Sequence, residues 1–289
     1  MSHTITNVLE RHDANGDLAP AVFDSPHSGT VYPSDFGHAL PRNALRRAED
    51  AFVDKLYQAV PSHGASLLCA LFPRSYVDPN RAADDIDESL LDGPWPDGVR
   101  PGPKVALGIG LIARREPGGS VYDRKLTVAE VQQRLNHYYW PYHRELERLL
   151  NQTYDQHGGV WHVNCHSMPA VSTVISPEGP GVKRPDFCIG DRDGTTCDSA
   201  FTAIVAETLH GMGYAVTVND PYKGVEIVRR YSDPRNARHS LQIEVNRGLY
   251  MDEDSIEMNH GFTALQKNLG RLIEAICNFA REQLETDKR

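Results

Sequence analysis

The chain has 289 residues, 40% of them hydrophobic and 24% charged, so it can bury a substantial core and is not a disordered protein. Its net charge of −9, without a long run of lysine and arginine, argues against a nucleic acid or an anionic membrane as its partner. No run of about 18 apolar residues and no apolar leader occurs, and the five cysteines form no C-x-x-C pair. These features predict a cytoplasmic, reduced protein.

The first part of the chain is predicted to alternate between strands and helices. Residues 1–19 form a loosely ordered lead-in, and the apolar run Ala21–Phe23 predicts a buried strand. Apolar residues at helical spacing predict a helix over residues 42–60, and a second apolar run predicts a strand over 65–71. A short strand in residues 74–81 should break at its proline.

The second part follows the same alternation. Residues 82–104, rich in Asp, Pro and Gly, predict a long surface loop. A helix over 127–157 should begin at Thr127, which has the capping-box partner Glu130, and Pro141 should kink or split it. Further strands are predicted at 160–167, 187–189, 214–218, 225–229 and 241–246, and further helices over 197–212 and 259–284. This order predicts one α/β domain over residues 1–289, with a mixed central sheet flanked by helices.

Two of the thirteen histidines end apolar strands and precede small residues, namely His27 and His166. The carboxyl ends of strands are where open α/β sheets collect ligands and catalytic groups. Two histidines, a carboxylate and an open position form the usual catalytic zinc site. On this pattern alone, a shared metal and a purely structural role for both histidines are equally supported.

A third metal ligand must come from elsewhere in the chain. Asp50 is the candidate, with Glu49 and Asp54 as competitors, and all three are alternatively charges on an exposed helix face. Asn164 lies two residues before His166 on the same face of the strand, so it can hold the imidazole ring. It is alternatively a strand-end residue that bonds to a neighbouring loop.

Glu244 is the candidate general base, because it lies among apolar residues of a late strand, where an unpaired carboxylate is costly. A metal-activated water needs such a carboxylate to take its proton and pass it to the leaving group. The alternative is a buried ion pair, for example with Arg247. Among the arginines in loops or at strand ends, Arg81, preceded by Asn80, is best placed to grip a carboxylate. The others of this kind are Arg184, Arg229 and Arg230.

Five short segments occur in a characteristic order: Asp24-Ser-Pro-His-Ser-Gly29, Asp78-Pro-Asn-Arg81, Asn164-Cys-His-Ser167, Arg184-Pro-Asp-Phe187 and Gln242-Ile-Glu244. Together they resemble the N-formylglutamate amidohydrolase family from about residue 20 to about residue 275. The resemblance implies a phosphorylase/hydrolase-like α/β fold shared with zinc carboxypeptidases, aspartoacylases and cell-wall amidases. It also implies one divalent metal, with zinc expected.

The resemblance also implies roles for individual residues. His27, His166 and Asp50 become metal ligands, Glu244 becomes the general base, and Arg81 and Arg229 become the carboxylate binders. The expected reaction removes a formyl or small acyl group from an N-acylated acidic amino acid. For N-formyl-L-glutamate the products would be glutamate and formate, in one route of histidine degradation.

Two departures from related patterns and two alternatives accompany this prediction. The family often has Asp where this chain has Asn164, and Thr30 stands where zinc carboxypeptidases have the glutamate of an H-x-x-E pair. One alternative is a related zinc deacylase or cell-wall peptide amidase, and the other is a non-catalytic relative that binds an anion. The sequence leaves the acyl group, the amino acid and the oligomeric state open.

Overall fold

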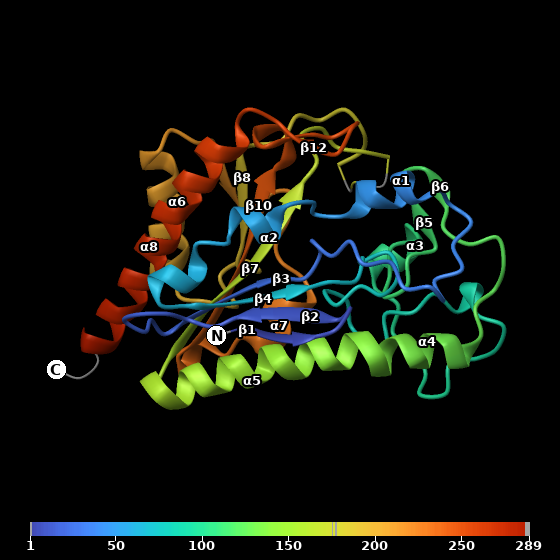
Figure 1. Cartoon of the computed structure of the whole chain (residues 1–289), viewed down its shortest axis with the longest axis horizontal. Helices are drawn as coiled ribbons and strands as arrows, with labels where there is room; N and C mark the ends of the chain where they lie inside the picture. Colours follow the sequence, from blue (N-terminus) through green and yellow to red (C-terminus); the bar gives the residue numbers. More distant parts are fainter. Residues whose placement is uncertain (1, 175, 177, 287–289) are drawn as a thin grey trace.

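The computed structural model describes residues 2–174, 176 and 178–286. Its centre is an eight-stranded mixed sheet with the strand order β1-β2-β4-β3-β7-β10-β8-β9 (Figure 1). The strands of this sheet are β1 Ser2–Ile5, β2 Leu9–His12, β3 Ala21–Ser25, β4 Ser66–Ala70, β7 Val160–Met168, β8 Phe187–Gly190, β9 Val216–Val218 and β10 Arg238–Asn246. The prediction of an α/β fold with a mixed central sheet is confirmed.

The middle of the sheet is parallel. Strand β3 pairs in parallel with β4 on one side and with β7 on the other, and β7 pairs in parallel with β10. The carboxyl ends of these four strands therefore share one edge of the sheet. Since the chain continues from β3 to β4 on one side and places β7 on the other, ligand sites are expected just beyond the end of β3.

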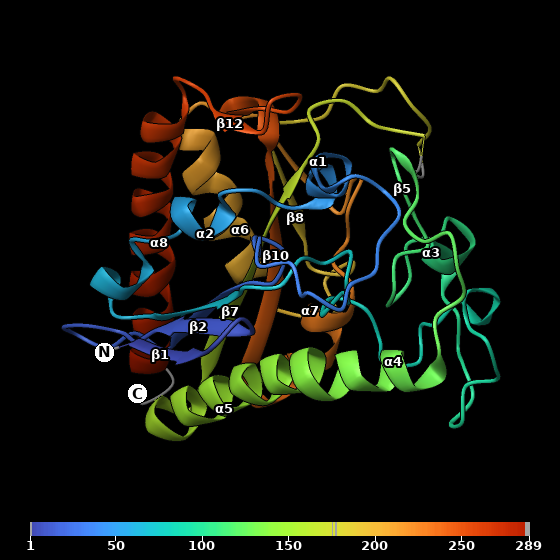
Figure 2. The same ribbon diagram turned by 45° about the vertical axis from the view of Figure 1, so that its right-hand side comes forward.

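Helices cover both faces of the sheet (Figures 1 and 2). On one face lie α4 Val128–Arg134 and α5 Trp140–His157, and on the other lie α6 Ser199–Gly211 and α8 Phe262–Thr286. Two separate apolar clusters fill the two interfaces. No helix in the described residues is long and apolar enough to cross a bilayer.

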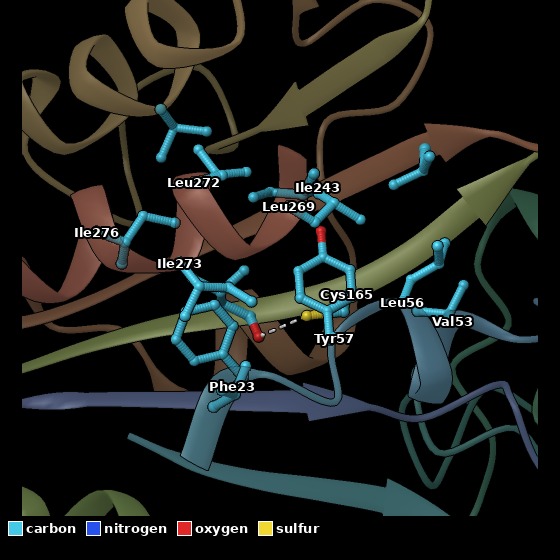
Figure 3. Packing of buried hydrophobic residues seen from close by; sticks show 14 of the residues in the cluster. Phe23, Val53, Leu56, Tyr57, Cys165, Ile243, Leu269, Leu272, Ile273 and Ile276 are labelled. Carbon is cyan, nitrogen blue, oxygen red and sulfur yellow. Dashed lines mark hydrogen bonds between the residues drawn. The ribbon is translucent and has the colours of Figure 1, made fainter. Parts of the chain in front are cut away.

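The alternation of side chains along the strands sorts residues between the two faces. Phe23 and Ile243 point toward α8, where Leu269 and Ile273 pack against them (Figure 3). The same cluster holds Val163, Leu241 and Val245. The intervening residues of β7 and β10 point the other way, and there the sequence is polar: His162, Asn164 and His166 on β7, and Ser240, Gln242 and Glu244 on β10.

The long predicted helix is split, as its proline suggested. Thr127 caps α4 in a complete capping box with Glu130. A π-helical segment, Leu135–Tyr139, then separates α4 from α5. Pro141 lies in the first turn of α5, where a missing backbone N–H costs little.

The prediction of a single helix over residues 42–60 is wrong, because this segment forms several short elements. It consists of α1 Arg42–Leu45, α2 Val53–Leu56 and two 3₁₀ turns, Arg46–Ala48 and Val60–His63. The break occurs because the backbone N–H of Asp50 donates to the carbonyl of His27 at 3.0 Å and Phe52 adopts a left-handed conformation with φ 67°. This break delivers Asp50 to the end of β3.

Three other predicted elements differ from the structure. Most of the predicted loose lead-in over residues 1–19 is ordered where the structure describes it, from residue 2 on, because β1 and β2 pair with each other and β2 pairs with β4. Residues 74–81 form turns rather than a strand. Residues 225–229 belong to helix α7, Glu226–Tyr231, because the N–H of Ile227 in its first turn donates to the side-chain oxygen of Asn80 at 2.9 Å.

Candidate metal centre and active site

Three residues from distant parts of the sequence converge at the carboxyl edge of the parallel strands. His27 follows β3, Asp50 precedes α2, and His166 lies near the end of β7. The Nδ1 atoms of His166 and His27 lie 2.9 and 3.4 Å from the Oδ2 atom of Asp50. One potential ligand atom from each residue lies within 4.8 Å of the other two, and all three side chains are buried. Glu49 and Asp54 are not part of this cluster.

The cluster fits a divalent metal ion. The Nδ1 atom of His27 is buried and has no hydrogen-bond partner in the described part of the chain. Burial opposes ionisation of Asp50, but His166 and His27 overcome this effect and hold the pKa of its carboxyl well below the ordinary value. Two imidazole nitrogens and one carboxylate facing a common point form a donor set that zinc accepts.

Each histidine is held through its other ring nitrogen, as metal-binding histidines usually are. The Nε2 atom of His27 lies 2.7 Å from a carboxylate oxygen of Asp78, and the Nε2 atom of His166 lies 2.7 Å from the Oδ1 atom of Asn164. With a metal bound by the two Nδ1 atoms, the ring protons belong on Nε2, where Asp78 and Asn164 accept them; without a metal, the 2.9 Å contact of His166 with the carboxylate of Asp50 requires a proton on Nδ1. Asn164 therefore lies where its predicted role requires, whereas the role of Asp78 was missed by sequence reasoning.

Two arginines neutralise the buried carboxylates of the site, and the sequence analysis assigned neither of them this task. Arg247 donates to Asp50 Oδ1 at 2.9 Å, so it pairs with the candidate metal ligand rather than with Glu244. Arg74 donates to Asp78 Oδ2 at 2.8 Å. Despite burial, Arg74 and His27 hold the pKa of Asp78 well below its usual range. An arginine four residues before an aspartate was the only local signal of this pair.

Glu244 lies directly beside the cluster, because it is in register with His166 on the adjacent parallel strand. Its Oε1 atom accepts a hydrogen bond from Gln242 at 2.8 Å. Burial raises the pKa of Glu244, against the effect of His166, which favours the ionised form. A carboxyl with a raised pKa at the edge of a metal cluster is suited to accept and return a proton near neutral pH.

The cluster opens into a cleft of about 490 Å³. Its walls carry seven cationic and six acidic side chains: Arg46, Arg47, Arg74, Arg81, Lys104, Lys223 and Arg247, and Glu49, Asp78, Glu116, Glu244, Glu253 and Asp254. Five of the cations form ion pairs with carboxylates, whereas Arg81 and Lys104 form no salt bridge within the described residues. Burial, together with the neighbouring Arg81 and Arg74, lowers the pKa of Lys104 to about 8. Burial raises the pKa of Glu116, which lines the same cleft, to about 7. Arg81 and Lys104 therefore provide the unpaired positive charge of the cleft, which favours an anionic ligand.

The predicted substrate-binding residues divide into two pairs. Arg81 and Asn80 line the cleft, and Arg81 is oriented by donating to the carbonyls of Ile109 and Asn80. Arg184 and Arg229 are absent from the described cleft lining.

The placement of these two arginines has a physical reason. Arg184 is buried and donates to Glu178 and to Ser176, so it fastens the loop between β7 and β8. Arg229 is 56% exposed and pairs with Glu226 one helical turn earlier, because its segment is a helix rather than the predicted strand. The structure therefore places Arg184 and Arg229 in contacts with neighbouring carboxylates rather than in the cleft lining, and their binding of substrate stays a prediction.

This fold and site define an α/β protein with a buried His–Asp–His cluster, an adjacent glutamate and a cation-lined cleft at one edge of a mixed sheet. Residues 19–251 match the model of the N-formylglutamate amidohydrolase family, so the chain belongs to that family, as the resemblance indicated. Membership of this family makes the chain an amidohydrolase.

Individual relatives agree with this assignment. The N-formylglutamate deformylase of Pseudomonas aeruginosa is 28% identical over 240 residues, which are 82% of this chain and 84% of that protein. The N-formylglutamate deformylase of Pseudomonas putida is 28% identical over 244 residues, or 81% and 82% of the two chains. A crystal structure of N-formylglutamate amidohydrolase from Ralstonia eutropha JMP134 is 45% identical, with a TM-score of 0.90 over 96% of this chain and 99% of the other.

Proposed function

We propose that this chain is a zinc-dependent N-formylglutamate deformylase, which hydrolyses N-formyl-L-glutamate to L-glutamate and formate. The substrate follows from what the relatives are named for, and the two cations of the cleft that form no salt bridge within the described residues, Arg81 and Lys104, support a dicarboxylate. The observation that carries the proposal is the pair of Nδ1 atoms, from His27 and His166, that face one carboxylate oxygen of Asp50. The reaction would end one route of histidine degradation.

The residues of the site suit the reaction. His27, Asp50 and His166 would hold the metal, which when bound supplies Lewis-acid activation of the formyl carbonyl and of the attacking water. Glu244 accepts the proton of that water and donates it to the leaving nitrogen. Arg81 and Lys104 attract the two substrate carboxylates into the cleft, where the surrounding protein excludes bulk water and strengthens each ion pair.

Replacement of Glu244 by glutamine tests the reaction. The Glu244→Gln protein should retain zinc, because Glu244 is outside the cluster, but lose turnover by roughly 10²–10⁴, the usual contribution of a general base. Glu207, on the distant surface of α6, provides the matched control Glu207→Gln, which should be as active as the wild type. Near-normal turnover by a zinc-loaded Glu244→Gln protein would refute the role of Glu244.

A substrate panel tests the specificity and the metal. Formyl and acetyl derivatives of glutamate, aspartate and glutamine should be assayed for amine release before and after chelation, and then after zinc is restored. N-formylglutamate should be the preferred substrate, and chelation should abolish its turnover reversibly. Preference for an acetylated or uncharged side chain would refute the substrate assignment, and full activity of metal-free protein would refute zinc dependence.

A further inference from the structure

A line of buried polar groups connects the core of the sheet to His166. Asp24 on β3 is in register with Asn164 on the neighbouring β7, and both side chains are completely buried. The amide nitrogen of Asn164 donates to Asp24 Oδ1 at 2.7 Å, while the amide oxygen of Asn164 lies 2.7 Å from Nε2 of His166. Asp24 itself does not line the cleft in the described part of the protein.

The carboxylate of Asp24 is fixed and ionised. His162 donates to the same oxygen that Asn164 binds, at 2.9 Å, and Tyr142 donates to the other oxygen at 2.6 Å. The second ring nitrogen of His162 lies 2.8 Å from the hydroxyl of Ser240. Although burial opposes ionisation, the hydrogen bonds from His162 and its neighbours hold the pKa of Asp24 below its ordinary value.

An ionised carboxylate only accepts hydrogen bonds, whereas an amide presents a donor on one side and an acceptor on the other. Asp24 therefore requires the nitrogen of Asn164 to face it, and the oxygen of Asn164 must then face His166. With the opposite orientation, Asn164 would donate to Nε2 of His166 and drive the ring proton onto Nδ1. That proton would occupy the nitrogen that faces Asp50.

Asn80 supports the same orientation from the other side. Its amide nitrogen lies 3.2 Å from the oxygen of Asn164 and 3.0 Å from Nε2 of His166, and its own oxygen accepts from the N–H of Ile227. The oxygen of Asn164 thus faces the amide of Asn80 and Nε2 of His166. The 3.0 Å contact between Asn80 and Nε2 is a hydrogen bond only when Nε2 has no proton, so with the proton on Nε2 Asn80 donates to Asn164 alone. Asp24 is the only charged group of the described chain that contacts this amide.

From this geometry we propose that Asp24 is a positioning residue that acts through Asn164: it sets the amide so that His166 carries its proton on Nε2 and offers Nδ1 to the metal. The inference rests on the proposed zinc site.

A double-mutant cycle on zinc affinity tests the proposal. Zinc dissociation constants should be measured by competition with a chromogenic chelator for the wild type, Asp24→Asn, Asn164→Ala and the double variant. Each single variant should bind zinc about tenfold more weakly, within the range for residues behind metal ligands. In the Asn164→Ala background, Asp24→Asn should have no further effect, because the amide through which Asp24 acts is gone.

Additive effects of the two substitutions would overturn the proposal. If Asp24→Asn weakens zinc binding by the same factor in both backgrounds, Asp24 acts by direct electrostatic attraction or by general loosening, and the proposal is overturned. Tyr142→Phe is the matched control, since it removes a hydrogen bond to the other oxygen of Asp24 and leaves Asn164 bonded. It should reduce stability to urea without changing zinc affinity, and a loss of affinity equal to that of Asp24→Asn would also overturn the proposal.

A measurement on the zinc-loaded wild type does not depend on any variant. The ¹⁵N chemical shifts of the imidazole rings report which nitrogen carries the proton and which binds zinc, and the ring of His166 is assigned through its own backbone resonances. A proton on Nε2 supports the proposal, and a proton on Nδ1 overturns it. Failure of the wild type to bind zinc would refute the proposed function itself, whereas additive effects in a zinc-binding protein would refute only this inference.

Discussion

His143 provides a test of a buried neutral group that supports the active-site loop. It lies on α5 and is 2% exposed, with its Nε2 atom 2.9 Å from the carbonyl of Pro79 and its Nδ1 atom 2.7 Å from the hydroxyl of Tyr231. Pro79 precedes Asn80 and Arg81 in the cleft wall. Burial, aided by the nearby Arg230, lowers the pKa of His143 from 6.5 to about 3.

The sign and size of the effect follow from this shift. Because the pKa is lower in the folded state, the unfolded chain binds more protons between about pH 3 and 6.5, and stability is lost as the pH falls through this range. At pH 4.5 the unfolded histidine is almost fully charged while the folded one is neutral. This difference of about one bound proton, accumulated over the two pH units from 6.5 to 4.5, lowers the free energy of unfolding by about 2–3 kcal/mol relative to pH 7.

Urea unfolding of the wild type and of His143→Gln at pH 7.0 and pH 4.5 measures this quantity. Glutamine cannot titrate, so the stability advantage of the wild type should shrink by about 2–3 kcal/mol at the lower pH. Carboxylates common to both proteins cancel in the difference. His210→Gln, at an exposed position on α6, controls for the loss of a histidine. If the difference in free energy of unfolding between the wild type and His143→Gln is the same at both pH values, His143 is not held neutral in the folded protein.

Two further pairs of variants test the cleft and the fold. Arg81→Ala should raise the KM for an acidic N-acyl amino acid about 10- to 100-fold, because it removes a hydrogen bond between charged groups. Arg229→Ala should leave KM and kcat within about twofold of the wild-type values. Equal effects of the two would contradict the placement of Arg229 outside the cleft. Gly29→Ala should lower the free energy of unfolding by about 1–3 kcal/mol, because its Cβ would lie 2.3 Å from the carbonyl oxygen of Phe72, while Gly211→Ala meets no atom within 4 Å and should not destabilise. Chemical denaturation compares the two, and a fully stable Gly29→Ala protein would show that this backbone contact is not tight.

The parts of the site that local patterns encode were predictable. An apolar run that ends in a histidine and a small residue identifies His27 and His166, because strand periodicity and strand ends are properties of a few neighbouring residues. Glu244 could be found for the same reason, since a carboxylate among apolar residues of a strand is costly unless it is used. The order of the short segments then supplied the family.

The rest depended on contacts between distant segments. Helical spacing continues through residues 42–60, so nothing local reveals that the bond from Asp50 to His27 breaks the helix. Val225–Arg229 has the composition of a strand, but a tertiary hydrogen bond from the N–H of Ile227 to the side-chain oxygen of Asn80 favours a helix there, and Arg229 then faces solvent. The alternative in which Arg247 pairs with Glu244 could not be decided locally, because the carboxylate to which Arg247 donates, that of Asp50, lies 197 residues away.

The spacing of the three cluster residues also has a thermodynamic consequence. His166 and Asp50 are separated by 116 residues, and no two members of the cluster form a chelating pair within a short segment. The unfolded chain therefore offers a metal only isolated ligands, so nearly all of the binding free energy would add to the stability of the native state. Metal affinity in this protein would accordingly report on the assembly of the whole parallel sheet: a destabilising change far from the cleft would lower the apparent affinity, and a metal supplied in excess would raise the melting temperature.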